Sequence, residues 1–205
     1  MSDNHDHGHH HPDETTEVEY KTQALETILL EKGLITTEEI DDLIDLFENQ
    51  IGPLNGAKLV ARAWVDPEFK AKLLADGTNT IAEFGIINMQ NTKFVVVENL
   101  PEVHNVIVCT LCSCYPWNVL GLPPSWYKSN AYRSRVVIEP REVLKDFGLE
   151  LDETVEIRVW DSLAETRYMV LPERPHGSEH MTEDELIQLI TRDALVGVSK
   201  VNLAQ

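Results

Sequence analysis

The chain has 205 residues, of which 42% are hydrophobic and 25% are charged, the balance of an ordinary globular protein of one or two domains. Its 17 Lys and Arg residues stand against 35 Asp and Glu residues, so the formal net charge is −18. This charge argues against binding to nucleic acid or to an anionic membrane surface, because both depend on Lys and Arg.

No apolar run approaches the roughly 18 residues of a membrane span. The N-terminus lacks the basic start and the apolar stretch of a secretory signal. We therefore expect a cytoplasmic protein that does not enter a membrane.

Residues 1–16 are polar and are predicted to form a disordered tail. The tail holds five of the eight histidines of the chain: His5, His7, His9, His10 and His11. Tracts of this kind bind transition metals, so metal scavenging and a simple solvated tail both remain open.

Residues 17–85 are predicted to be a helical arm followed by further helices. Thr36 and Glu39 have the spacing of a capping box, which predicts the start of a helix after Gly33. Asp66 followed by Pro67 predicts another helix start, and that helix should end by Asp76. Apolar residues recur at helical spacing in the first two helices: Leu25, Ile28, Leu29, Ile40, Leu43, Ile44 and Phe47. Two short helices cannot bury these residues alone, so we expect the arm to lie against another surface.

Residues 86–205 are predicted to form a mixed α/β layered core, which makes the fold class α+β. Strands are expected at residues 94–97, 106–108 and 155–159, with residues 167–171 as the neighbour of the third strand. Thr182 and Glu185 form a second capping box and open a helix that carries Leu186, Leu189 and Ile190.

All three cysteines lie within six residues, in Cys109-Thr-Leu-Cys112-Ser-Cys114, directly after the second predicted strand. A metal ion held by the sulfurs of Cys112 and Cys114 can also bind the deprotonated amide nitrogens of Ser113 and Cys114. Cys109 can then add an axial sulfur and leave a sixth position open. These anionic donors favour a low-spin trivalent ion, so the sequence predicts a Cys-rich metal loop in the core.

Other uses of the cysteines stay open on spacing alone. Zinc prefers four tetrahedral ligands, and His104 can be the fourth. Cys109 and Cys112 can form a redox pair, although Pro116 interrupts the helix that usually follows such a pair. Iron–sulfur clusters usually need a fourth cysteine, which the chain does not have.

The cysteine motif and its flanks closely resemble the α subunit of nitrile hydratase. The resemblance rests on residues 109–117 and on Leu120-Gly-Leu-Pro-Pro-Ser-Trp-Tyr-Lys128, and it extends over nearly all of the chain after residue 20. It implies a non-haem centre with the sulfurs of Cys109, Cys112 and Cys114 and the backbone nitrogens of Ser113 and Cys114 as ligands. It also implies that Cys112 becomes a sulfinic acid and Cys114 a sulfenic acid. Thr110 and Tyr115 resemble the cobalt-type members, so Co(III) is expected and iron is the less favoured metal.

The resemblance further implies a hydro-lyase that converts a small nitrile to an amide and is active only with a β subunit, as a heterodimer or heterotetramer. The metal would act as a Lewis acid, and the sulfenate oxygen of Cys114 or an activated water would attack. A cobalt-insertion activator protein is a further implied partner. The residues assigned to catalysis on this basis are Cys114, Ser113, Gln90 and Trp117.

One related enzyme shares the cysteine motif: the metal-binding subunit of thiocyanate hydrolase, which tends to have Arg after Tyr-Pro. Trp117 stands there in this chain and favours a neutral nitrile over an anion. Asn118 departs from the family, which usually has Pro. Further expectations concern Arg133 and Arg135 as partners of sulfur oxyacids or of a subunit interface, Arg167 near a subunit contact, and Asp161 as support for the metal loop.

Overall fold

The computed structural model describes residues 17–51, 54–88, 91–112 and 114–203, and the expected tail over residues 1–16 lies outside them. Contacts within the chain divide it into two compact units, Met1–Ile44 and Asp45–Gln205. Among the described residues, no helix combines the length and the apolar character that a membrane crossing requires.

The first unit contains helix α1 (Glu17–Glu31) and most of helix α2 (Thr37–Asp45). The predicted capping box is confirmed: the Glu39 amide donates to Thr36 Oγ1 over 3.2 Å, and Glu39 Oε2 accepts from the Thr36 amide over 2.8 Å. Large apolar side chains stay exposed on both helices: Leu25, Ile28, Leu43 and Ile44. The two helices therefore do not bury their own apolar residues.

The second unit begins with a short π-helix, η1 (Leu46–Ile51), and three α-helices: α3 (Leu54–Val65), α4 (Pro67–Ala75) and α5 (Gly77–Glu83). The predicted helix start at Asp66 is confirmed, because its carboxylate accepts from the Glu68 and Phe69 amides. The sequence did not predict α5. Asp76 starts this helix by accepting from the Asn79 amide, so the residue expected to end one helix also caps the next.

Four strands form two parallel pairs: β1 (Lys93–Glu98) with β4 (Thr166–Leu171), and β2 (Val103–Val108) with β3 (Glu156–Asp161). The prediction that residues 167–171 lie beside the third strand is wrong, since β4 pairs with β1 instead. A bridge between Leu100 and Val103 reverses the chain between β1 and β2. The chain therefore runs through β1 and β2 in opposite directions, and each of these two strands pairs in parallel with a strand from the second half of the chain.

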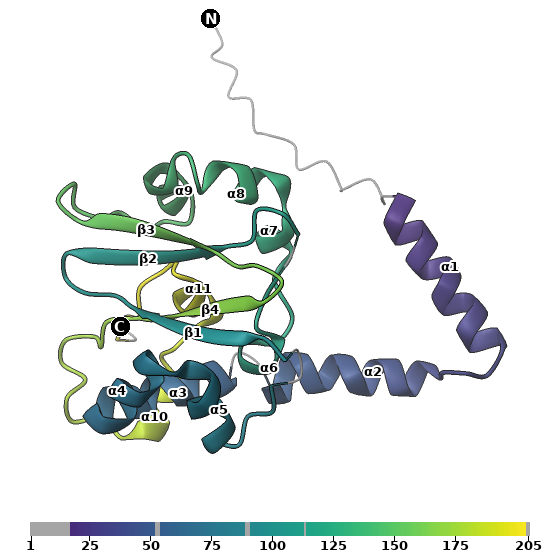
Figure 1. Ribbon diagram of the computed structural model, residues 1–205, viewed down its shortest axis with the longest axis horizontal. Helices are drawn as coiled ribbons and strands as arrows, with labels where there is room; N and C mark the ends of the chain where they lie inside the picture. Colours follow the sequence, from purple (N-terminus) through teal and green to yellow (C-terminus); the bar gives the residue numbers. More distant parts are fainter. Residues whose placement is uncertain (1–16, 52–53, 89–90, 113, 204–205) are drawn as a thin grey trace, which may run out of the picture. The chain divides into compact units, whose positions relative to one another are not determined.

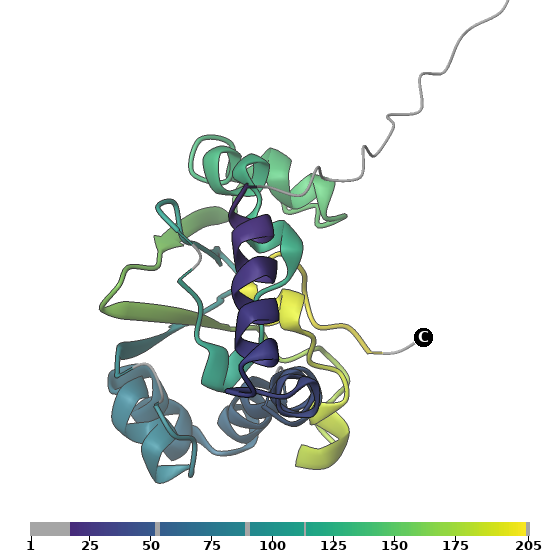
Figure 2. The ribbon, with the colours of Figure 1, turned by 90° about the vertical axis from the view of Figure 1, so that its right-hand side faces the viewer.

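Helices enclose the strands on two sides. In Figure 1, α8 and α9 lie beyond β3, whereas α3, α4, α5 and α10 lie beyond β1, and Figure 2 shows the same two groups above and below the strands. Helix α11 packs across β4 and β2. The helices of the second half are α6 (Trp117–Leu120), α7 (Ser125–Lys128), α8 (Asn130–Arg135), α9 (Pro140–Asp146), α10 (Glu183–Ile187) and α11 (Arg192–Val196). The fold is α+β, as expected.

The capping box at Thr182 and Glu185 is confirmed at the start of α10. Leu189 and Ile190 lie after the end of this helix, which is shorter than the sequence predicted.

Gly197 follows α11 with a φ of 92° and lies close to the backbone of β2. A Cβ atom at this position would lie 2.0 Å from the Asn105 carbonyl oxygen, so only glycine lets α11 approach β2 this closely.

Candidate metal centre

The three cysteines gather at the carboxyl end of β2. Cys109 is buried directly after the strand, Cys112 is exposed and Cys114 is half-buried. Their three sulfur atoms all lie within 4.8 Å of one another. Ser113, assigned to the site from the sequence, lies outside the described residues.

The spacing of the sulfurs tests which ion they fit. Cys112 Sγ lies 3.3 Å from Cys109 Sγ and 3.0 Å from Cys114 Sγ. Both separations are too long for a disulfide, whose sulfurs are about 2.05 Å apart. With metal–sulfur bonds of about 2.3 Å, these two sulfur–sulfur distances would correspond to sulfur–metal–sulfur angles of about 80–90°. A tetrahedral site would need sulfurs about 3.8 Å apart. The donor set therefore fits an ion with near-perpendicular ligands.

His104 is not the fourth ligand that a zinc site would need. It lies on β2 and is buried, with Nε2 2.7 Å from the Gly197 carbonyl oxygen and Nδ1 3.2 Å from Asn99 Nδ2. Both ring nitrogens are thus engaged, and burial lowers the pKa of the imidazole below its usual value. Among the described residues, the metal-ligating group contains only the three cysteines.

Three side chains hold the backbone of the cysteine loop. Asp161 lies opposite Val108 at the end of β3, and its carboxylate accepts from the Thr110 amide at 2.9 Å and from Thr110 Oγ1 at 2.6 Å. Arg133 on α8 donates to the carbonyl oxygens of Cys109 and Thr110 at 3.1 and 2.7 Å. The parallel pairing of β2 and β3 thus explains why Asp161 supports the loop, as the sequence suggested.

Tyr127 supplies the third contact. Its hydroxyl donates to the Cys114 carbonyl oxygen at 3.0 Å, and its fully buried ring packs edge to face on Tyr115. The sequence did not single out Tyr127, because nothing local distinguishes an aromatic residue that packs in the core from one whose hydroxyl binds a distant carbonyl. The described contacts of Arg133 go to backbone carbonyls, a role that the sequence did not suggest, and its expected part in binding a sulfur oxyacid or a subunit interface stays a prediction.

The electrostatic surroundings of the thiols favour a bound cation. Burial raises the pKa of the Cys114 thiol to about 12, and the neighbouring thiols of Cys112 and Cys109 act in the same direction. The Arg167 guanidinium opposes this shift in pKa. Because three thiolates cannot form so close together without compensating charge, a multivalent ion is the species that would stabilise all three.

Arg167 and Arg135, the other two arginines considered from the sequence, make different contacts. Arg167 is buried on β4 and donates to the Leu163 and Thr166 carbonyl oxygens, while its Nε has no partner among the described residues. Arg135 forms ion pairs with Glu139 and Asp146 at 2.6 and 2.7 Å. Within this chain Arg135 thus forms ion pairs with carboxylates, and its expected interface role stays a prediction, whereas Arg167 places a buried positive charge near Cys114.

The other predicted site residues have mixed outcomes. Trp117 begins α6, is 40% exposed and packs edge to face on Phe47, with ring centroids 5.9 Å apart. Trp126 is partly buried and packs on Tyr132 and Phe147 against the core. Gln90 lies outside the described residues.

The cysteine loop is open on its outer side. Leu111 and Cys112 are exposed, and Leu111 shows 80% of its surface. A cavity of about 490 Å³ lies elsewhere, near the carboxyl ends of β1 and β4, where Asn99, Glu173 and Lys200 are among its lining residues. The outer side of the cysteine loop is thus exposed at Leu111 and Cys112 in the described part of the chain.

Known proteins resemble this chain over most of its length. The model of the family described as nitrile hydratase, alpha chain, matches residues 16–199. The chain belongs to this family. The match includes all three cysteines and the residues that hold their loop.

Three relatives of the alpha chain show the range of the family. The alpha subunit of the low-molecular-weight cobalt-containing nitrile hydratase of Rhodococcus rhodochrous is 56% identical over 188 residues, which cover 92% of this chain and 91% of that protein. A double mutant of the Fe-type nitrile hydratase of Comamonas testosteroni Ni1 is 48% identical, with a TM-score of 0.82 and 91% of each chain covered. The gamma subunit of thiocyanate hydrolase from Thiobacillus thioparus is 41% identical, over 91% of this chain and 81% of that protein.

Proposed function

We propose that this chain is the metal-holding subunit of a nitrile hydratase, which adds water to a nitrile and releases an amide. In this proposal the ion is Co(III), and its ligands are the sulfurs of Cys109, Cys112 and Cys114 and the backbone nitrogens of Ser113 and Cys114. The choice of cobalt is supported by the cobalt-containing relative from Rhodococcus rhodochrous and by the cobalt-type residues Thr110 and Tyr115.

The observation that carries the proposal is the cluster of three sulfurs with separations of 3.0 and 3.3 Å. Such short separations match ligands at about 90° and not the wider tetrahedral angle of structural zinc. A zinc or redox module without catalysis would use four closed ligands or two sulfurs, and neither describes this cluster.

The residues of the site have separate parts in the proposed reaction. A trivalent ion at the three sulfurs would supply Lewis acidity, which makes the weakly electrophilic nitrile carbon easier to attack. Cys114, oxidised beforehand to a sulfenate by molecular oxygen, offers an oxygen that attacks this carbon or orients the attacking water. Where the sulfenate oxygen attacks, water replaces it, so one water is consumed per amide formed. Trp117 contributes an apolar wall beside the site, and Ser113 and Gln90 remain assigned to it.

A second subunit completes the proposed enzyme. The exposed outer side of the loop, at Leu111 and Cys112, needs a cover that excludes bulk water and encloses the substrate. The resemblance to the family implies that a β subunit supplies this cover and adds arginines that bind the oxidised cysteines. A cobalt-insertion activator protein and a cytoplasmic location belong to the same proposal.

Metal analysis of the assembled protein tests the proposal directly. The chain should be co-expressed with its β subunit and activator in medium containing cobalt, and the purified complex should contain about one cobalt per chain and no zinc. It should convert acrylonitrile to acrylamide. The Cys114→Ser variant should lose cobalt or turnover, because it removes the sulfur that the reaction needs. A fully active, cobalt-loaded C114S complex, or a zinc-loaded inactive wild type, would contradict the proposal.

Thiocyanate hydrolysis is the second candidate, favoured by the relative from Thiobacillus thioparus. Trp117 argues against it, because an apolar indole offers no positive charge to an anionic substrate. Assays of the same complex with acrylonitrile and with thiocyanate distinguish the two enzymes. Turnover of thiocyanate alone would replace the first proposal by the second.

A further inference from the structure

One peptide group of the cysteine loop is bound by opposite charges on its two sides. The Thr110 amide donates to the Asp161 carboxylate at 2.9 Å, and the Cys109 carbonyl oxygen accepts from Arg133 Nε at 3.1 Å. These two atoms belong to the same peptide unit. Its dipole therefore runs from the guanidinium to the carboxylate, and both hydrogen bonds are charge-assisted, the strong kind.

Arg133 is directed at the loop by its helix. Ser129 caps helix α8, since its hydroxyl accepts from the Tyr132 amide, and Arg133 lies in the last turn of this six-residue helix. The neighbouring Arg135 binds the carboxylates of Glu139 and Asp146. The described contacts of Arg133, by contrast, both go to backbone carbonyls of the cysteine loop.

The orientation of this peptide sets the path of the loop that follows Cys109. The chain has two soft dihedral angles per residue, so fixing the peptide after Cys109 fixes the ψ of Cys109 and the φ of Thr110. Together these angles set the direction in which the loop leaves β2 and returns to place Cys112 Sγ 3.3 Å from Cys109 Sγ. The Cys112 amide also donates to Cys109 Sγ over 3.3 Å, which requires the same loop path.

We infer that Arg133 is a positioning residue of the metal centre, which holds Cys109 and the loop after it in the arrangement that binds the ion. The inference rests on the proposed metal centre. Arg133 contacts no sulfur in the described structure and acts through two carbonyl groups. Replacing it should therefore leave the ligands in place but loosen their geometry, which weakens metal retention and changes the ligand field.

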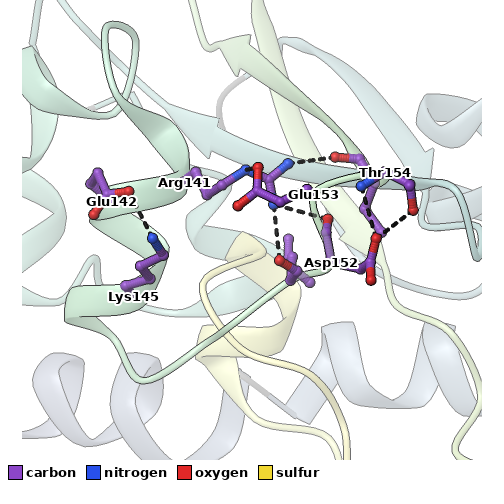
Figure 3. Close-up of polar contacts among 8 residues, drawn as sticks. Arg141, Glu142, Lys145, Asp152, Glu153 and Thr154 are labelled. Carbon is purple, nitrogen blue, oxygen red and sulfur yellow. Dashed lines mark hydrogen bonds and ion pairs between the residues drawn. The ribbon is translucent and has the colours of Figure 1, made fainter.

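Arg141 offers a matched control. Figure 3 shows this arginine, on α9, reaching the loop before β3, where it donates to the carbonyl oxygens of Leu151, Asp152 and Val155 at 3.1, 3.1 and 2.7 Å. It is half-buried like Arg133 and also binds backbone carbonyls, with an additional ion pair to Glu153 at 3.8 Å. Its loop lies at the opposite end of the six-residue strand β3 from Asp161, about 20 Å away at the usual rise of a strand.

The test compares complexes with the β subunit that contain wild-type chain, Arg133→Met, Arg133→Lys or Arg141→Met. The measurements are melting temperature, cobalt per chain, the rate of cobalt release into excess chelator and the sulfur-to-metal charge-transfer absorption. R133M and R141M should lower the melting temperature by similar amounts. Only R133M should release cobalt faster, by about 10–100-fold, the usual effect of removing a side chain that orients metal ligands, and only R133M should shift the absorption band.

The conservative variant keeps the test valid if R133M does not assemble. Lysine keeps the charge but cannot reach two carbonyls with a rigid fork, so R133K should accelerate cobalt release in the same direction but less. The inference would be overturned if R133M released cobalt at the wild-type rate and kept the wild-type spectrum, or if R133K did so where R133M does not assemble. It would also be overturned if R141M accelerated cobalt release as much as R133M. A wild-type complex without cobalt would instead contradict the proposed function, so the two failures are distinguishable.

Discussion

Single residues hold the cysteine loop mainly by its backbone, with one further contact to the Thr110 hydroxyl. Arg133, Asp161 and Tyr127 bind carbonyl or amide atoms of Cys109, Thr110 and Cys114. Any residue type offers these atoms, so no sequence pattern marks the contact. The cysteines and Asp161 could be predicted because their chemistry and position were visible in the sequence. The roles of Arg133 and Tyr127 could not, because they depend on which distant carbonyl each side chain meets.

Asn118 shows how this chain compensates for a departure from its family. The side-chain Nδ2 of Asn118 donates to the Ile87 carbonyl oxygen at 2.9 Å, and the backbone carbonyl oxygen of Asn118 accepts from Asn55 Nδ2 at 3.0 Å. The side chain is buried, so it ties the segment around Ile87 to the helix that follows the cysteine loop. The sequence showed only that Asn118 departs from the family proline, and the structure adds that its side chain forms this hydrogen bond.

Asn118→Ala should therefore loosen the segment around Ile87. The loss of one buried hydrogen bond costs about 1 kcal/mol, which lowers the melting temperature by about 2–4 °C for a chain of this size. Hydrogen exchange at residues 86–88 should become faster. Unchanged exchange there would show that the tie does not restrain this segment.

Asn118→Pro is the informative companion variant. Position 118 is the second residue of α6, where a proline is tolerated because the first turn leaves its amides free. The proline variant should fold and keep its metal, and its exchange at residues 86–88 should match that of Asn118→Ala. Wild-type exchange in Asn118→Pro would mean that ring packing restrains the segment as well as the amide does.

At the scale of elements, the sequence predicted where helices begin better than how strands pair. Thr36, Asp66 and Thr182 each start a helix as predicted, because a cap and its partner lie within three residues of each other. The pairing of β4 with β1 joins residues that are more than 70 positions apart, such as Lys93 and Thr166. Alternation of apolar residues shows which face of a strand is buried but does not show its neighbour.

Gly197→Ala should strongly destabilise the second unit. Its new Cβ would meet the Asn105 carbonyl oxygen at 2.0 Å, and its φ of 92° is unfavourable for alanine. Strain and overpacking together should cost about 3–6 kcal/mol in the free energy of unfolding. Chemical denaturation of the complex, or of the chain where it can be purified, measures this cost.

Gly148→Ala is the control for that substitution. Gly148 also has a positive φ, of 80°, but no atom lies within 4 Å of a Cβ built there. Only the backbone strain remains, so the cost should be about 1–2 kcal/mol. Equal destabilisation by both substitutions would show that the approach of α11 to β2 is not tight.

At the scale of the whole molecule, the chain has more apolar surface on its first helices than those helices can bury. Leu25 and Ile28 of α1 are 57% and 47% exposed, and α2 has no buried residue among those described. This agrees with the expectation of an arm that needs another surface. The three-part division into residues 1–16, 17–85 and 86–205 remains a prediction about domains.

Replacing Leu25 and Ile28 by serine should weaken the association with the β subunit. Each buried Leu or Ile side chain contributes about 1.5–3 kcal/mol, so the double variant should lose at least about 100-fold in affinity. Co-purification or a binding titration measures the loss. The control is Gln23→Ser with Glu26→Ser, on the opposite face of α1, which should bind like wild type. If both double variants bind equally well, α1 does not contact the partner.

The parallel pairing of β2 with β3 also sets an order of events during protein synthesis. The thiols of Cys109 to Cys114 leave the ribosome before Arg133 and well before Asp161, which follows about 50 residues later. At 5–20 residues per second, translation takes roughly 2–10 s to supply the carboxylate that fixes the Thr110 amide. During that interval the nascent chain exposes three neighbouring thiols on an unfinished loop, so slower elongation through residues 115–161 lengthens the period in which oxidants can reach them.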